Sequence, residues 1–342
     1  MTHLCVVIVT FNRLEKLQRT LRHVLAAQAD SVVVVDNACS DGSAEWLDSL
    51  RDPRLTVLHL DRNQGGAGGF HHGFSHVLQQ GHADWIVCHD DDAWPEASAF
   101  LRFRAMLPSL PDTVGGVAAA VYTPQYRICE MNRPSLNPFG TARRLLTTLL
   151  QGRMGFHLPD AAYRGSAPAD IDCSSFVGCF LRVSTMHRTQ LLPRRELFIY
   201  ADDVLYTYSL RQAGMRMVFL PEIVFIHDCE SLEAESGRYT RLWRMYYTYR
   251  NGIELYRQLA GRLFPLVMVL KLVSWLLKGR HYPGNQPYYR VLGQAVVDGL
   301  RGDFSRSHDD VLKLAAATGV PAAKHPSRQR LAPAPFIRKR LP

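Results

Sequence analysis

The sequence lacks the features that would place the protein across a membrane or in an oxidising compartment. No apolar run reaches the roughly 18 residues of a membrane span, since Lys271 interrupts the stretch 263–277. The seven cysteines contain no C-x-x-C pair, and Cys5 and Cys88 fall within apolar, strand-like runs. We therefore expect reduced thiols, a reducing compartment and no zinc site. Because a strand-like run begins at residue 4, we also expect no secretory signal.

The bulk composition is that of a globular protein with an anionic partner. Of the 342 residues, 47% are hydrophobic and 21% are charged, which excludes wholesale disorder and allows one large domain or two ordinary ones. The net charge of +9 suggests phosphates, nucleic acid or a lipid surface as the partner. Charge alone does not choose among these three.

The first part of the chain alternates between strand-like and helix-like patterns. Continuous apolar runs at 4–9, 32–35 and 85–88 predict buried strands, Leu55, Val57 and Leu58 predict a shorter one, and leucines at helical spacing over 14–25 predict a helix. A glycine-rich turn at 65–69 is expected to open another helix. This alternation predicts an α/β fold with an open, mostly parallel sheet flanked by helices. We place this domain at residues 1–237.

Residues 238–320 differ in kind from what precedes them. From 238 to 290 the chain carries ten Lys or Arg residues against one acid, Glu254, with tyrosines and tryptophans interleaved. A basic, aromatic-rich helical region is typical of a membrane-surface element, although helices packed on the first domain could show the same pattern. The Pro- and Arg-rich residues 321–342 predict a disordered tail.

Three consecutive acids, Asp90, Asp91 and Asp92, follow the fourth apolar run. The carboxyl ends of parallel strands form the edge at which open α/β folds bind ligands. Like charges this close repel one another, so Mg²⁺ or Mn²⁺ together with substrate phosphates is the natural partner. The alternative is a solvated acidic turn that caps a helix.

Other polar residues are predicted at the same edge. The first strand is followed by Thr10, Asn12 and Arg13, and the second by Asp36; a carboxylate there can bind a base or ribose, and an arginine can bind phosphate. Glycines before a helix permit close approach to an anion, or simply form a tight turn. Here they follow Asn63 and are Gly65, Gly66, Gly68 and Gly69.

Two further acids and one histidine complete the candidate chemistry. Asp202 and Asp203 precede a helix-like stretch, where one could act as general base toward a sugar hydroxyl or merely cap the helix. His227 follows the last apolar run. It could be a nitrogen ligand of the same cation, or an ordinary residue at a strand end.

The ordered motifs TFNR, VVVVDNACSDGS, RNQGGAGGF, HDDD, FIYADD and LPEIVFIHD resemble those of the family-two inverting glycosyltransferases, which have a GT-A fold. The resemblance spans residues 4–230 and is strongest to galactofuranosyltransferases, with bacterial rhamnosyltransferases sharing much of the pattern. It implies UDP-galactofuranose or dTDP-rhamnose as donor and Mn²⁺ or Mg²⁺ as cofactor. The basic C-terminal helices fit such an enzyme with a glycan or glycolipid acceptor, such as a lipopolysaccharide intermediate, and we expect it in the cytoplasm, peripheral to the inner face of the membrane.

The resemblance also implies roles for individual residues. It makes Asp203 the base, and Asp90, Asp92 and His227 the metal ligands. It assigns the donor to Thr10, Asn12, Arg13, Asp36, Asn63, Gly65, Gly66, Gly68, Gly69, Asp90 and Asp91. It assigns the acceptor to Asp202, Ser175 and Phe176, in a segment that lacks the paired tryptophans of polymerising galactofuranosyltransferases.

Two other classes of function fit part of the pattern. A nucleotidyltransferase could use the same edge and metal, but it would need a basic phosphate cradle, and the glycine segment offers only Arg62. A nucleic-acid-binding protein would account for the positive charge and the aromatic residues, but it leaves the acids unexplained. We therefore expect no nucleic acid partner.

Overall fold

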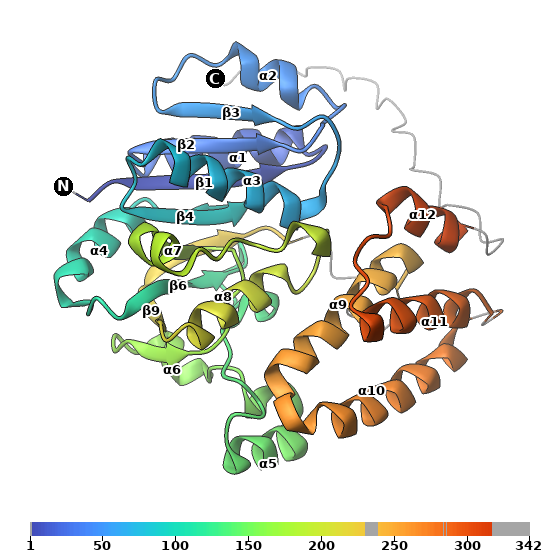
Figure 1. The fold of residues 1–342 in the computed structure, drawn as a ribbon. Helices are drawn as coiled ribbons and strands as arrows, with labels where there is room; N and C mark the ends of the chain where they lie inside the picture. Colours follow the sequence, from blue (N-terminus) through green and yellow to red (C-terminus); the bar gives the residue numbers. More distant parts are fainter. Residues whose placement is uncertain (1, 230–238, 283, 285, 317–342) are drawn as a thin grey trace, which may run out of the picture.

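The computed structural model describes residues 2–229, 239–282, 284 and 286–316. Its centre is a nine-stranded sheet in the order β3-β2-β1-β4-β8-β6-β9-β5, with β7 paired to β9 (Figure 1). The strands are β1 (Leu4–Thr10), β2 (Ser31–Asp36), β3 (Leu55–His59), β4 (Trp85–Asp90), β5 (Ala93–Pro95), β6 (Val114–Tyr122), β7 (Ala169–Ile171), β8 (Cys179–Arg182) and β9 (Arg216–His227).

The predicted α/β fold is confirmed, and the parallel part of the sheet is its N-terminal half. Strands β3, β2, β1 and β4 are all parallel, so their carboxyl ends share one edge. Strand β8 then runs antiparallel to both β4 and β6, while β6 and β9 are parallel. The short strand β5, which directly follows the three acids, pairs antiparallel with the end of β9. This pairing brings the acids next to the end of β9.

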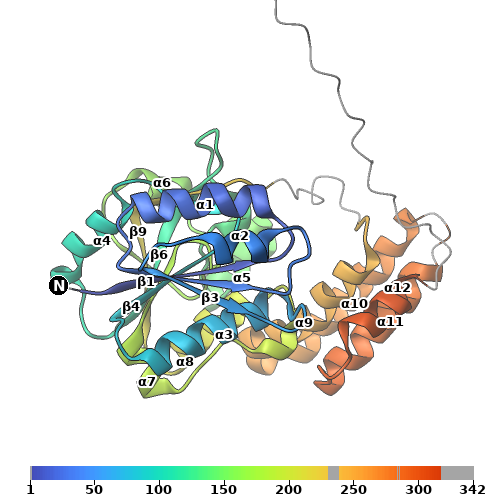
Figure 2. The same cartoon turned by 90° about the horizontal axis from the view of Figure 1, so that it is seen from above.

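Helices cover both faces of the sheet, as Figure 2 shows from above. One face carries α1 (Leu14–Ala26), α2 (Ser43–Ser49) and α4 (Ala99–Met106), and the other carries α3 (Gly65–Gln80), α7 (Val183–Thr189) and α8 (Asp202–Gln212). Alternate residues of β1 face opposite sides, with Val6 packed in the first layer and Val7 in the second. Burial on both faces explains why the strands are continuously apolar.

The C-terminal helices form a separate cluster beside the sheet edge (Figure 1). They are α9 (Leu242–Ala260), α10 (Phe264–Lys278), α11 (Gln286–Arg301) and α12 (His308–Ala316); the remaining helices are α5 (Ala142–Gln151) and α6 (Asp160–Arg164). The predicted domain boundary at 237/238 and the predicted disordered tail 321–342 lie outside the described residues.

The aromatic residues of this region do not form a surface. Tyr246, Tyr247, Tyr249 and Tyr288 are buried and, with Trp275, make up much of the core among the four helices. Their interleaving with basic residues is therefore accounted for by packing. The expectation of no membrane-length apolar segment was wrong, because the segment Leu242–His281 is long and apolar enough to cross a membrane by length and composition.

Candidate active site

The strand pairing brings the first and third acids of the triplet to His227. Asp90 ends β4, and the pairing of Ala93 with His227 places Asp92 beside the end of β9. The Nε2 atom of His227 lies 3.1 Å from Oδ1 of Asp92. One potential ligand atom from each of Asp90, Asp92 and His227 lies within 4.8 Å of the other two. Residues predicted from opposite ends of the domain thus meet at one point.

A buried asparagine sets the orientation of the His227 ring. Asn132 donates from Nδ2 to Oγ of Ser175 at 2.9 Å, which leaves its Oδ1 to accept from Nδ1 of His227 at 2.7 Å. With its proton on Nδ1, His227 presents the Nε2 lone pair toward the Asp92 carboxylate. Two acceptors that face each other at 3.1 Å require a proton or a cation between them. Two carboxylates and one such imidazole therefore fit Mn²⁺ or Mg²⁺.

The charges of the triplet are unequal because their surroundings differ. Burial raises the pKa of Asp90 to about 7, and the nearby Asp92 charge adds to this effect. Burial also raises the pKa of Asp91 to about 6, although the charge of Arg13 opposes the shift. Burial would raise the pKa of Asp92 too, but its hydrogen bond with His227, formed when a proton lies between Nε2 and the carboxylate, and the charges of protonated His227, Arg13 and Lys16 lower it overall.

The middle acid holds the loop after β1. Oδ2 of Asp91 accepts from Oγ1 of Thr10 at 2.8 Å and from the Phe11 N–H at 3.4 Å. Arg13 spans two acids, with Nη1 3.3 Å from Oδ1 of Asp91 and 2.6 Å from Oδ2 of Asp92. Thr10 and Arg13, predicted to contact the nucleotide, thus lie at the expected edge, where they contact the acid triplet.

Asp36 and Asn12 lie at the same edge and organise its backbone. Oδ1 of Asp36 accepts from the Cys39 N–H at 2.8 Å, and Oδ2 lies 2.7 Å from Nδ1 of His59. Oδ1 of Asn12 accepts from the Ser40 N–H at 2.7 Å. These contacts fix the loop after β2 beside Thr10, since Thr10 and Asp36 are direct partners in the β1–β2 register.

The glycine segment differs from its prediction. It was expected as a turn before a helix, but α3 begins at Gly65 and includes all four glycines. A Cβ at Gly65, which has φ +70°, would lie 2.0 Å from the Phe198 carbonyl oxygen, and one at Gly69 would lie 2.3 Å from Val9 Cγ1. Asn63 precedes the N-cap residue Gln64, and its Oδ1 accepts from the Gly65 N–H at 2.8 Å. Close packing of α3 thus accounts for Gly65 and Gly69, while Gly66 has open space beside it.

The acid pair opens α8 after a loop of unusual backbone, which we call the base loop (residues 195–201). Phe198, Tyr200 and Ala201 all have positive φ, between 62° and 71°. Burial raises the pKa of Asp202 and of Asp203, and the charge of Asp203 raises that of Asp202 further. Oδ1 of Asp203 accepts from its neighbour's backbone N–H at 2.7 Å. Two adjacent carboxylates are thereby kept at the site with an increased affinity for protons.

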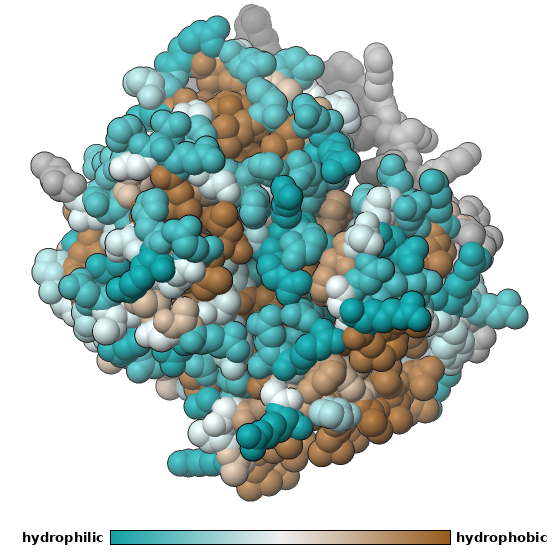
Figure 3. Space-filling view, in the orientation of Figure 1, coloured by the Kyte–Doolittle hydropathy of each residue, from teal (hydrophilic) through white to brown (hydrophobic). Residues whose placement is uncertain are grey.

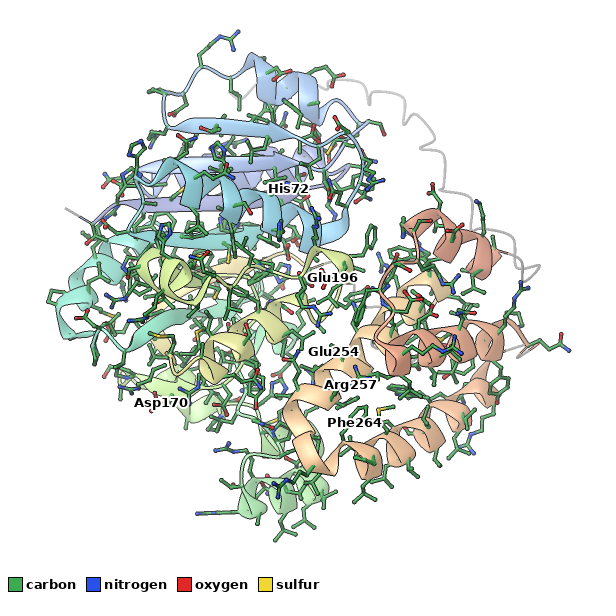
Figure 4. The ribbon with its side chains drawn as sticks, viewed as in Figure 1. His72, Asp170, Glu196, Glu254, Arg257 and Phe264 are labelled. Carbon is green, nitrogen blue, oxygen red and sulfur yellow. The ribbon has the colours of Figure 1, made fainter. Side chains whose placement is uncertain are left out.

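The C-terminal helix α9 holds the base loop in place. Asn251, fully buried, shares its Nδ2 group among the carbonyl oxygens of Leu197, Ile199 and Tyr200 at 3.0, 2.8 and 2.9 Å. The buried Arg250 donates to the Leu197 oxygen at 2.9 Å. At the rim of this contact, Arg194 pairs with both Glu196 of the loop and Glu254 of α9. Figure 4 labels these two glutamates, one on the loop and one on α9. No local sequence pattern predicts these contacts.

The predicted acceptor residues have different positions. Ser175 is partly exposed and bonded to Asn132. The Phe176 side chain, however, is buried among Phe70, Phe74 and Tyr206, so its ring is core packing and only its backbone N–H reaches Asp203. A contact between Phe176 and the acceptor therefore stays a prediction for its backbone, since the ring packs inward.

Sulfur atoms lie on the far side of His227. Sγ of Cys129 is 3.7 Å from Sγ of Cys229 and 3.9 Å from Nδ1 of His227, and all seven cysteines are free thiols. These three residues form a second group of potential ligands. The spacing of the cysteines in sequence concealed this group, since Cys129 and Cys229 come from separate loops.

Comparisons with known proteins agree with this geometry. Residues 5–166 match the family described as "Glycosyl transferase family 2". The galactofuranosyltransferase GlfT1 of Mycobacterium tuberculosis is 29% identical over 257 residues, covering 72% of this chain and 79% of that protein. GlfT1 of Mycolicibacterium smegmatis is 28% identical over 264 residues, covering 73% and 83%.

Solved structures share the fold at low identity. TarS residues 1–349 of S. aureus, in complex with UDP-GlcNAc, superposes with a TM-score of 0.53 at 15% identity, covering 92% of this chain and 91% of that one. GalNAc-T7 with UDP, GalNAc and Mn²⁺ has a TM-score of 0.51 at 14% identity, covering 74% and 51%. These similarities support the GT-A architecture.

Proposed function

We propose that this chain, whose residues 5–166 match glycosyltransferase family 2, transfers galactofuranose from UDP-galactofuranose to a hydroxyl group, with inversion at the anomeric carbon. The observation that carries the proposal is the meeting of Asp90, Asp92 and His227 at the sheet edge of a chain whose curated relatives include galactofuranosyltransferases. The match to this family sets aside the nucleotidyltransferase and the nucleic-acid-binding alternatives.

The acid triplet and its partners would bind the donor diphosphate. Asp90, Asp92 and His227 would hold Mn²⁺ or Mg²⁺, which when bound supplies positive charge to the departing nucleoside diphosphate. Arg13 is half-exposed beside Asp92 and can turn from the carboxylates to a phosphate. Asp36 and Asn12 would shape the site of the base and ribose from the neighbouring loops.

Asp203 would act as the general base. Burial raises its pKa toward neutrality, which makes its carboxylate a stronger base while a useful fraction stays ionised. It would take the proton of the acceptor hydroxyl as that oxygen attacks the anomeric carbon from the side opposite the leaving diphosphate. The acceptor would enter past Ser175 and Asp202. We further propose that the acceptor is a glycan or glycolipid, such as a lipopolysaccharide intermediate, and that the enzyme works at the cytoplasmic face of the membrane.

Donor identity can be tested by protection against thermal unfolding. A bound donor stabilises the folded protein by RT ln(1 + [L]/Kd), about 2.7 kcal/mol at a hundredfold excess over Kd. UDP-galactofuranose with Mn²⁺ should raise the unfolding temperature more than UDP, UDP-galactopyranose or dTDP-rhamnose. A larger shift with dTDP-rhamnose would replace the proposed sugar. Equal shifts with UDP and with every UDP-sugar would remove the basis for galactofuranose.

A further inference from the structure

Helix α10 is apolar on two sides, and only one side is covered. Val267, Met268 and Trp275 are buried, and Met268 and Trp275 pack in the cluster with α9 and α11. The opposite side leaves a stripe of side chains each at least half exposed, with spacings of three and four residues: Leu266, Val269, Leu270, Val273, Leu276 and Leu277. A soluble helix usually turns polar residues to this side. The stripe therefore indicates contact with another apolar phase.

Helix α5, from the catalytic domain, adds a second apolar stripe. Leu146, Leu149, Leu150 and, just beyond the helix, Met154 are between 54% and 75% exposed. The segment before α5 touches the end of α9 just before α10 begins, since Nδ2 of Asn137 donates to the Leu259 oxygen at 3.0 Å. Figure 3 shows the resulting hydrophobic surface along the lower edge of the molecule, over α5 and α10.

The two segments that form this surface carry no negative side chain. Neither 141–157 nor 261–290 contains an Asp or a Glu. The exposed Lys and Arg residues of these segments are Arg143, Arg153, Arg262, Lys278, Arg280 and Arg290. An apolar surface with a basic rim matches a bilayer that carries anionic headgroups. A second copy of the chain would instead bring two basic rims together.

We propose that the exposed faces of α5 and α10 form one docking surface for an anionic lipid bilayer, with both helices lying in the headgroup region. The segment Leu242–His281 is long enough to cross a membrane as a whole, but a break at Gly261 (φ +51°) separates α10 from α9. Helix α10 alone has 15 residues, or about 22 Å at 1.5 Å per residue, which is shorter than a hydrocarbon core of about 30 Å. Its buried side is already committed to α9 and α11. The role of this docking surface rests on the proposed function, since a glycolipid acceptor would be presented here. The binding of the surface to a bilayer does not depend on that function.

Cosedimentation of the full-length protein with vesicles tests this surface. Vesicles of phosphatidylcholine with about a third phosphatidylglycerol should bind the wild type, and pure phosphatidylcholine vesicles should bind it several-fold less. L270E/V273E should lower the partition coefficient on the anionic vesicles by tenfold or more, and L149E/L150E by at least threefold. L101E is the matched control, because Leu101 is 69% exposed and its helix, α4, lies away from α5 and α10 (Figure 1). This variant should sediment as the wild type does.

Each other outcome would overturn the proposal. Wild-type sedimentation of L270E/V273E would exclude α10, and an effect confined to α10 would exclude a joint surface. A wild-type dimer that L270E/V273E converts to a monomer, by light scattering, would make the surface an interface between copies. Thermal shifts with donor and Mn²⁺ on the same variants should match the wild type, so loss of the donor effect alone would count against the proposed function and leave vesicle binding standing.

Discussion

The hold of α9 on the base loop is open to a direct test, substitution of Asn251 by Leu. Leucine has nearly the shape of asparagine but no donors, so the carbonyls of Ile199 and Tyr200 would lose their bonds from Asn251, while the Leu197 carbonyl would keep its bond from Arg250. Losing a buried hydrogen bond in this way costs about 1–3 kcal/mol. Two such losses together cost roughly 3 kcal/mol, which the loop can recover by moving out of its native conformation.

The native conformation of the base loop is itself unfavourable. Phe198, Tyr200 and Ala201 have positive φ, and each such residue costs on the order of 1–3 kcal/mol. Without Asn251, the loop therefore has little reason to keep Asp203 where the acceptor meets it. A loss of about 3 kcal/mol of positioning corresponds to roughly a hundredfold in rate. We expect kcat of Asn251→Leu to fall by about that factor, with the donor KM within about threefold of the wild type.

Steady-state kinetics with a soluble acceptor would separate these parameters. Tyr288→Phe is the matched control, because Tyr288 is equally buried in the same helices but bonds to the Trp275 oxygen at 2.6 Å, away from the loop. It should lower the unfolding temperature while kcat stays near that of the wild type. The reasoning is refuted if Asn251→Leu keeps its kcat, or if Tyr288→Phe loses as much activity as Asn251→Leu.

Three further predictions concern the site itself. Asp203→Asn should lower turnover by roughly a hundredfold or more while thermal shifts with donor persist, and near-normal turnover would remove Asp203 as the base. Asp92→Ala should weaken donor binding in Mn²⁺ by roughly tenfold or more in calorimetry, with little change in EDTA. Because burial raises the pKa of Asp90 to about 7, the folded protein takes up that proton, so without a cation it should gain stability as pH falls through 7 toward 4. The stabilisation by Mn²⁺ should instead increase as the pH rises from 4 to 7, because Asp90 then loses its proton. A pH-independent effect of Mn²⁺ would exclude Asp90 as its ligand.

Strand periodicity carried most of what the sequence could predict. Buried parallel strands are continuous apolar runs, so the residues after them had to meet at one edge, as Thr10, Asp36 and Asp90 do. His227 was predicted from the same rule. Its approach to Asp92, however, depends on the short strand β5, which no sequence pattern predicted.

The remaining site residues depend on contacts between distant segments. Asn132 lies in a single 3-10 turn (Glu130–Asn132) and meets His227 across 95 residues, and Asn251 meets the base loop across more than 50. Neither has a periodicity or a motif of its own. The glycines were ambiguous for a related reason, since a glycine required by a close helix–strand approach looks in sequence like one that cradles a phosphate.

The dual role of the C-terminal helices determines how membrane binding can be studied. A chain truncated after Arg238 would lose the apolar stripe of α10, and we expect it to stop sedimenting with anionic vesicles. It would also lose Asn251 and Arg250, so the base loop would lose its support and turnover should fall even with a soluble acceptor. Truncation alone would therefore not distinguish the loss of membrane binding from the loss of the contacts that hold the base loop. The substitutions L270E/V273E and Asn251→Leu separate them, because the first changes only a solvent-facing stripe and the second only a buried hydrogen-bonding group.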